Sequence, residues 1–306
     1  MARHGVLAVF SALLAISGCS SPTPDGGVTP DAWATTTRTV TVGGLERSFV
    51  VSAPASALTA DRLPLLIMLH GAGGDAASFA SLTGMTPLAE QSNFVVVYPN
   101  GTPGARVPGE LAWNAGECCG TPARTGLDDV AFIDELITNV EVHFHTDPER
   151  VFVAGYSNGG MLSYRLVCEL GERVAGIADV SGAFNVPECA APAPTAVLII
   201  HGTADSVVPY DGGATSAEVA ERFGAWTNAS VAAAVDSWAT TNECDLEPVA
   251  TTRGAVTTSR FTGCAADSSL ELVSIAGGAH RWPTQGNSAV AASELIVQFF
   301  GLARVH

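Results

Sequence analysis

Six short apolar runs in this sequence each end in glycine, and longer segments separate them. The segment 128–144, for example, places Val130, Ile133, Ile137 and Val140 on one helical face. Continuous apolar runs are typical of strands buried on both faces, and their alternation with helices is typical of a mostly parallel sheet. We predict these strands at LPLLIMLHG, FVVVYPNG, VFVAG, VAGIADVSG, TAVLIIHG and LELVSIAG.

An antiparallel hairpin is predicted ahead of these runs, with Thr39 to Val42 and Ser48 to Val51 joined at Gly43-Gly44. The fold prediction is therefore α/β, with about eight strands in a mostly parallel sheet and helices on both faces. Ser288 to Phe300 is predicted to form a last amphipathic helix. A chain of 306 residues, 47% of them hydrophobic, can bury one such core, so we expect a single domain over 37–306.

The N-terminus has the pattern of an export signal, because Arg3 precedes an apolar stretch over 6–16 and small residues follow it. The ending ISGC resembles a bacterial lipobox, in which Cys19 is lipidated and begins the mature chain. We expect a signal peptide at 1–18 and a flexible tether at 19–36, rich in Pro, Gly and Thr. The protein would then be lipid-anchored at the outer membrane or cell surface. An ordinary signal peptide and a secreted protein are the alternative.

The charge balance argues against one class of partner. The formal net charge is -16, and the 14 basic residues are all arginines, scattered without a basic run that could neutralise phosphates. We therefore expect no nucleic-acid partner and no membrane contact beyond the lipid anchor. We also expect a monomer.

The cysteine count favours disulfides. Setting Cys19 aside leaves six of the seven cysteines, an even number in an exported chain. Proximity in the sequence suggests three bonds, which are Cys118 with Cys119, Cys168 with Cys189, and Cys244 with Cys264. The sequence contains neither two CxxC-like pairs nor clustered histidines, so we predict no metal site.

The stretch GYSNGGM places Ser157 between two glycines, directly after VFVAG and before the helical segment MLSYRLVCEL. In a strand-turn-helix elbow of this kind the serine takes a strained backbone conformation, and small neighbours leave it room. The context indicates that Ser157 is a nucleophile. A serine hydroxyl requires a base held by an acid, and with this motif the partners follow in the order Ser, Asp or Glu, His.

The histidines downstream of the serine are His201, His280 and His306. We assign His280 as the base, because it follows a predicted strand into a glycine-rich loop, whereas His201 ends a strand and His306 ends the chain. Asp205 lies just past the preceding strand and is the candidate acid, with Asp211 as its main competitor. Since the chain supplies these groups itself, no cofactor is implied.

Two backbone N–H groups should also face the developing oxyanion, since losing one such donor costs roughly 10²- to 10³-fold in rate. One should come from Asn158, the residue after the serine. The other should come from the glycine-rich loop at 70–74, where we choose Ala72 and leave Gly71 and Gly73 open. His70 is predicted to be a structural hydrogen-bonding residue of that loop.

Five motifs together resemble one family, namely LHGAGGD, WNAGECCG, GYSNGGM, HGTADSVVPY and GGAHRWP. They are similar to secreted esterases of the polyhydroxybutyrate depolymerase and feruloyl esterase family, including LpqC-like lipoproteins. The resemblance covers roughly residues 37 to 300 and implies an α/β-hydrolase fold and carboxylic ester hydrolysis. It implies the same triad, and it places Trp113, Asn114 and Trp282 beside the substrate pocket. Packing of Trp113 beside the cysteine pair is the alternative for that residue.

The shared motifs encode ester chemistry, so the pocket decides the substrate. No added substrate-binding module is evident, which favours feruloyl or acetyl esters of plant xylan, with Trp113, Trp226 or Trp282 as surfaces for ring stacking. Polyhydroxybutyrate or its oligomers are the alternative substrate, and a peptidase or lipase would need only a different pocket. Outside enzymes, the alternative is a catalytically silent lipoprotein that binds a glycan or polymer.

Overall fold

The structure is a computed structural model that describes residues 1–2, 32–58, 62–104, 108–186, 189, 194–265 and 268–303. The chain divides into two units, 1–30 and 31–306, and the second holds every helix and strand assigned in the described residues. Cys19 and most of the predicted signal peptide and tether lie outside the described residues. Residues 33–36, predicted to belong to the flexible tether, instead form the start of a strand over Trp33–Val42, because they pair with the strand that follows. No helix within the described ranges has the length and hydropathy needed to cross a membrane.

A central sheet of ten strands organises the second unit. Its strands are β1 (Trp33–Val42), β2 (Leu45–Pro54), β3 (Leu63–Leu69), β4 (Val95–Pro99), β7 (Thr146–Tyr156), β8 (Gly176–Val180), β9 (Ala196–Gly202), β12 (Val249–Arg253), β13 (Val256–Phe261) and β14 (Ser269–Ile275). Their order across the sheet is β1-β2-β4-β3-β7-β8-β9-β14-β13-β12. The six strands from β4 to β14 are parallel, and an antiparallel pair extends the sheet at each end. Two short pairs lie outside it, β5 (Thr102–Pro103) with β6 (Leu111–Ala112) and β10 (Gly213–Ala214) with β11 (Thr227–Asn228).

All eight predicted strands belong to this sheet, and the mostly parallel arrangement is confirmed. The predicted number of strands was too low, because β12 and β13 had not been recognised. Every residue of β12 is exposed, so this threonine- and arginine-containing strand lacks the buried apolar face on which the prediction relied. The last helix begins at Ala292 instead of Ser288, because turns that close on Thr284 occupy the residues before it.

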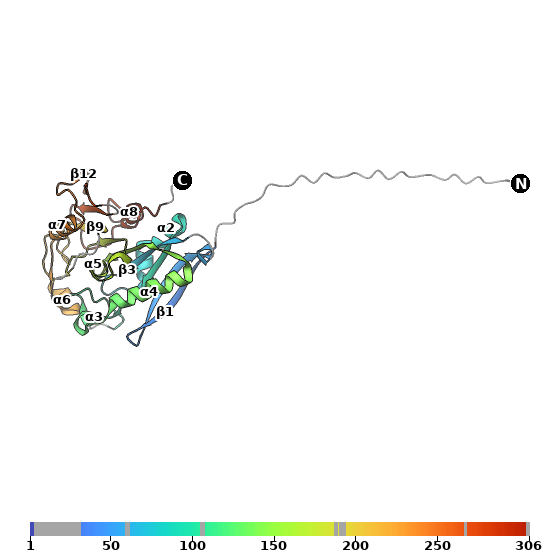
Figure 1. Ribbon diagram of the computed structural model, residues 1–306, viewed down its shortest axis with the longest axis horizontal. Coiled ribbons are helices and arrows are strands. Elements are labelled where there is room, and N and C mark those ends of the chain that lie inside the picture. Colours follow the sequence, from blue (N-terminus) through green and yellow to red (C-terminus); the bar gives the residue numbers. More distant parts are fainter. Residues whose placement is uncertain are drawn as a thin grey trace. The chain divides into compact units, whose positions relative to one another are not determined.

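Helices cover both faces of the sheet. They are α1 (Ala76–Thr83), α2 (Met85–Ser92), α3 (Gly120–Thr125), α4 (Asp129–Phe144), α5 (Asn158–Leu170), α6 (Ala217–Phe223), α7 (Val231–Thr241) and α8 (Ala292–Phe299), with 3-10 turns at Ala55–Leu58 and Gly171–Arg173. Figure 1 shows α4 alongside β1, and α8 next to α2.

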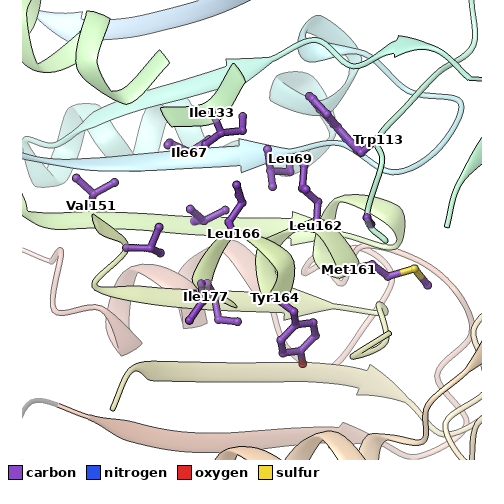
Figure 2. Packing of buried hydrophobic residues seen from close by; sticks show 14 of the residues in the cluster. Ile67, Leu69, Trp113, Ile133, Val151, Met161, Leu162, Tyr164, Leu166 and Ile177 are labelled. Carbon is purple, nitrogen blue, oxygen red and sulfur yellow. The ribbon is translucent and has the colours of Figure 1, made fainter. Parts of the chain in front are cut away.

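Successive side chains of β3 enter different cores, because strand residues alternate between the two faces of a sheet. Leu65, Ile67 and Leu69 pack in the layer that holds α4, α5 and α7. Figure 2 shows Ile67 and Leu69 in this layer with side chains of α5. Leu66 and Met68 pack in the opposite layer with α1, α2 and α8. The sheet buried between these two layers presents the carboxyl ends of its parallel strands along one edge, where three loops converge.

Candidate active site

The elbow predicted at Ser157 is present. β7 ends at Tyr156, α5 begins at Asn158, and Ser157 between them has φ 54° and ψ -118°. A side chain at positive φ is strained, and such strain persists only where the surrounding structure holds it. Here the Ser157 N–H donates to the carbonyl of Val180 at 2.9 Å, and its carbonyl accepts from the N–H of Met161 at 2.9 Å.

The flanking glycines are required by close backbone contacts. A Cβ on Gly155 would lie 2.5 Å from the nitrogen of Gly160. A Cβ on Gly159 would lie 2.6 Å from the carbonyl oxygen of His70. The glycines of GYSNGGM therefore allow the start of α5 to pack against the end of β7 and against the loop that follows β3.

Ser157, His280 and Asp205 lie at the ends of three parallel strands, β7, β14 and β9, and form one hydrogen-bonded chain. The His280 Nδ1 lies 2.7 Å from Asp205 Oδ2, and its Nε2 lies 3.0 Å from Ser157 Oγ. Because a carboxylate can only accept, Nδ1 donates its proton to Asp205, which leaves Nε2 to accept from the serine hydroxyl. Asp211, the competing acid, is exposed and makes no such contact.

The carboxylate of Asp205 is held in its ionised form. Burial by itself would raise the pKa of Asp205, but hydrogen bonds from His201 and His280 outweigh it and hold the pKa well below its usual range. The backbone N–H groups of Val207 and Val208 also donate to Oδ1, at 2.8 and 2.9 Å. An ionised acid of this kind fixes the orientation and tautomer of the imidazole beside it.

Backbone N–H groups face the same site. Asn158 is the first residue of α5, whose N-terminus carries partial positive charge. In the glycine-rich loop, the Gly73 N–H donates to the carbonyl of Leu111 at 2.7 Å, which rules it out as an oxyanion donor. The Ala72 N–H meets no acceptor in the described part of the chain. Gly71 and Ala72 both line the cavity beside the serine and remain the two candidates.

His70 behaves as a structural residue of this loop. Its Nδ1 lies 2.8 Å from the carbonyl of Gly71, and its Nε2 accepts from the N–H of Gly101 at 3.0 Å. Burial lowers the pKa of His70 to about 4, so the imidazole is neutral at physiological pH. It ties the loop after β3 to the loop after β4.

Comparisons with known proteins agree with this geometry. Residues 50–237 match the family described as Phospholipase/Carboxylesterase. The chain belongs to this family. It is 31% identical to "Putative esterase NocK" of Nocardia uniformis subsp. tsuyamanensis, over 83% of this chain and 76% of that protein. It is 30% identical to Feruloyl esterase B of Piromyces equi, over 76% of this chain but only 42% of that longer protein.

Among solved structures, an acetyl xylan esterase from Aspergillus awamori has the same fold. Its TM-score is 0.60 at 17% identity, and the match covers 88% of this chain and all of that one. The predicted α/β-hydrolase fold is thus confirmed, as is the family resemblance. The chain is a carboxylic ester hydrolase of a serine hydrolase family.

The prediction that Trp113 and Asn114 lie at the substrate pocket of this esterase was wrong. Trp113 is fully buried, and its N–H and carbonyl bond the side-chain amide of Asn158 at 2.8 and 3.1 Å. The Asn114 N–H donates to the buried Asp129 at 2.7 Å. The segment's hydrogen-bonding groups are directed inward, so it supports the residue after the serine and does not form the cavity wall.

Trp282 also points away from the cavity. Its indole is 1% exposed and packs edge-on against Phe79, with ring centroids 5.3 Å apart. Its Nε1–H donates to Ser293 Oγ at 3.3 Å. After the His280 loop the chain turns into the core that holds α1 and α8, because burying the large apolar ring there is favourable.

The esterase has a cavity of about 450 Å³ beside Ser157 and His280, a size typical of ligand pockets. Gly71 and Ala72 line one part of it, and Phe223 and Trp226 line another. Trp226 is the one of the three suggested stacking surfaces that reaches the cavity. Phe223, Val219 and Arg222 come from α6, a short helix that lies outside all five motifs, so no motif could have identified them.

The six cysteines form the three predicted pairs, Cys118 with Cys119, Cys168 with Cys189, and Cys244 with Cys264. The first pair adjoins the site, since Cys119 lines the cavity and Cys118 Sγ lies 3.6 Å from the amide nitrogen of Asn158. Within the described ranges, no three His, Cys, Asp or Glu side chains cluster as metal ligands would.

Proposed function

We propose that the esterase works through an acyl-enzyme on Ser157. The observation that carries this proposal is the continuous hydrogen-bonded chain from Asp205 through His280 to Ser157, which ends at the cavity. His280 takes the hydroxyl proton as Ser157 attacks the ester carbonyl, and then returns it to the leaving alcohol. Water hydrolyses the acyl-enzyme by the same route in reverse.

The oxyanion of each tetrahedral intermediate is stabilised by the N–H of Asn158 and by that of Ala72 or Gly71. The buried contacts of Trp113 and Asn158 support this assignment, because they fix the first turn of α5 before substrate arrives. Donors held in advance need no reorganisation as charge develops, which is why they contribute strongly to rate.

Feruloyl or acetyl esters of plant xylan are the proposed substrates. The names of two relatives support this choice, Feruloyl esterase B and the bifunctional acetylxylan esterase/xylanase XynS20E of Neocallimastix patriciarum, which is 30% identical over 55% of this chain and 22% of that protein. The aromatic wall formed by Phe223 and Trp226 suits a planar ring. Hydroxybutyrate oligomers are the second candidate, because the same cavity wall could contact an aliphatic chain.

Export and anchoring are part of the proposal. The signal-like residues 1–18 and the lipobox at Cys19 support a protein that is attached to the outer membrane or cell surface through its lipid, with 37–306 acting as a monomeric catalytic domain beyond the tether. Mass spectrometry of the mature N-terminus tests the anchor directly, since an unmodified or absent Cys19 would contradict it.

The activity is tested with the purified chain lacking residues 1–19, on methyl ferulate and p-nitrophenyl acetate. Ser157→Ala should reduce turnover of both by about 10⁴-fold or more, while Ser259→Ala on β13, away from the cavity, should match the parent. Cleavage of the acetate alone would direct the search toward acetylated xylan and hydroxybutyrate oligomers. Activity retained by Ser157→Ala would refute the mechanism.

A further inference from the structure

The cavity beside Ser157 is lined by two kinds of side chain, and they belong to opposite layers of the fold. Phe223, Trp226 and Met161 line the cavity and pack with the core that holds α4, α5 and α7. Tyr156 lines it too, but its ring packs with the core that holds α1, α2 and α8. The cavity therefore has an aromatic and apolar wall from one layer and a phenol from the other.

The phenol lies beside the catalytic base. The rings of Tyr156 and His280 stack with their centroids 5.1 Å apart and their planes inclined by 30°. The tyrosine ring also lies against the glycine-rich loop, because a Cβ on Gly71 would come within 2.9 Å of Tyr156 Cδ1. Ser206, the residue after Asp205, lines the same cavity. Two residues with hydroxyl groups thus adjoin the part of the cavity that holds the imidazole.

Neither hydroxyl bonds to the protein. Tyr156 is half-buried and Ser206 is exposed, and their hydroxyl groups have no hydrogen-bond partner in the described part of the chain. Burial raises the pKa of Tyr156 above its ordinary value, so the phenol stays protonated and can both donate and accept. The aromatic wall differs, since the Nε1–H of Trp226 already donates to Asn228 Oδ1 at 2.7 Å. Free hydrogen-bonding groups are therefore found on the His280 side.

Proton transfer decides which half of an ester lies on that side. His280 Nε2 is 3.0 Å from Ser157 Oγ, and it gives the proton that it takes from the serine to the leaving alcohol. The alcohol oxygen must then come within hydrogen-bond reach of Nε2, about 3 Å. This requirement places the alcohol half of the ester beside Tyr156. The acyl half, which stays on Ser157 after the alcohol has left, is directed to the aromatic wall.

We propose that Tyr156 and Ser206 form a subsite for the alcohol half of the ester, and that this alcohol is a sugar ring with several hydroxyls. This inference rests on the acyl-enzyme proposed above. The phenol and the serine hydroxyl bond hydroxyls of the sugar, while Phe223 and Trp226 contact the acyl group. An alcohol without further hydroxyls would desolvate both protein groups and leave them without a partner, which lowers its affinity. The subsite therefore favours esters of sugars over esters of simple aliphatic alcohols.

Two esters with the same acyl group test this subsite. Mono-O-acetylated methyl xyloside and cyclohexyl acetate have alcohol rings of equal size, but only the xyloside ring carries hydroxyls. Tyr156→Phe keeps the ring stacked on His280 and removes only its hydroxyl, so kcat/KM should fall about tenfold for the xyloside ester and about twofold at most for cyclohexyl acetate. Ser206→Ala, at an exposed position, should act in the same direction. Trp226→Ala, the control at the aromatic wall, should change both rates by one factor.

Equal effects of Tyr156→Phe and Ser206→Ala on the two esters would refute the proposal, as would a ratio that changes in Trp226→Ala alone. A second measurement requires no turnover. Methyl xyloside, the alcohol that hydrolysis releases, should bind Ser157→Ala in an NMR titration, and adding Tyr156→Phe should raise its Kd about tenfold. An unchanged Kd would overturn the subsite. A wild type that binds methyl xyloside but cleaves neither ester would count only against the acyl-enzyme.

Discussion

A single methyl group at Gly159 should disable the esterase more than it destabilises it. The Cβ of Gly159→Ala would lie 2.6 Å from the carbonyl oxygen of His70 and 2.7 Å from the carbonyl carbon of Leu69, and both of these are backbone atoms. Backbone cannot rotate away as a side chain can, so α5 and the loop after β3 must separate by roughly 0.5–1 Å. These two segments carry Ser157 and the proposed oxyanion donors.

We expect kcat/KM to fall by about 10²-fold, since a misplacement of about 1 Å has this effect in a pre-organised site. The free energy of unfolding should fall by about 1–3 kcal/mol, typical of overpacking, or roughly 2–4 °C in Tm per kcal/mol. Initial rates on p-nitrophenyl acetate and thermal melts measure the two effects. Gly286→Ala is the control, because its Cβ would meet only Thr284 Oγ1, at 3.9 Å. Wild-type rates in Gly159→Ala would refute the reasoning.

Three further outcomes are expected. Burial raises the pKa of Asp179 to about 7, so the folded state keeps a proton that the unfolded chain releases near pH 4. The free energy of unfolding of the wild type should therefore fall, relative to that of Asp179→Asn, as pH rises from about 4 to about 7. Urea titrations of both proteins at pH 5 and pH 8 measure this difference, and an equal change in unfolding free energy for the two proteins would contradict the prediction. Replacing Cys244 and Cys264 by alanine should cost about 3 kcal/mol in the same assay, and an unchanged midpoint would count against a stabilising bond. Trp226→Ala should raise KM for methyl ferulate about tenfold, with Trp226→Phe less affected; an equal change for p-nitrophenyl acetate would argue against ring stacking.

Sequence patterns locate a strand, a turn or a helix through neighbours a few residues apart, but they do not state which way a loop side chain points. Trp113 and Trp282 flank catalytic motifs and were expected at the pocket, yet both indoles are buried in the core. β12 was not predicted for a different reason, because an exposed edge strand has no apolar face to detect.

The elbow at Ser157 could be identified from the sequence alone, because its conformation depends on glycines within a few residues and on the strand and helix that flank it. The parallel sheet was also predictable, since its buried strands are continuous apolar runs. Only the tertiary structure decided that Asp205 contacts His280, that Trp226 lines the cavity and that His201 lies against Asp205. Those contacts depend on the order and register of strands far apart in the chain, and this long-range pairing leaves no local pattern in the sequence.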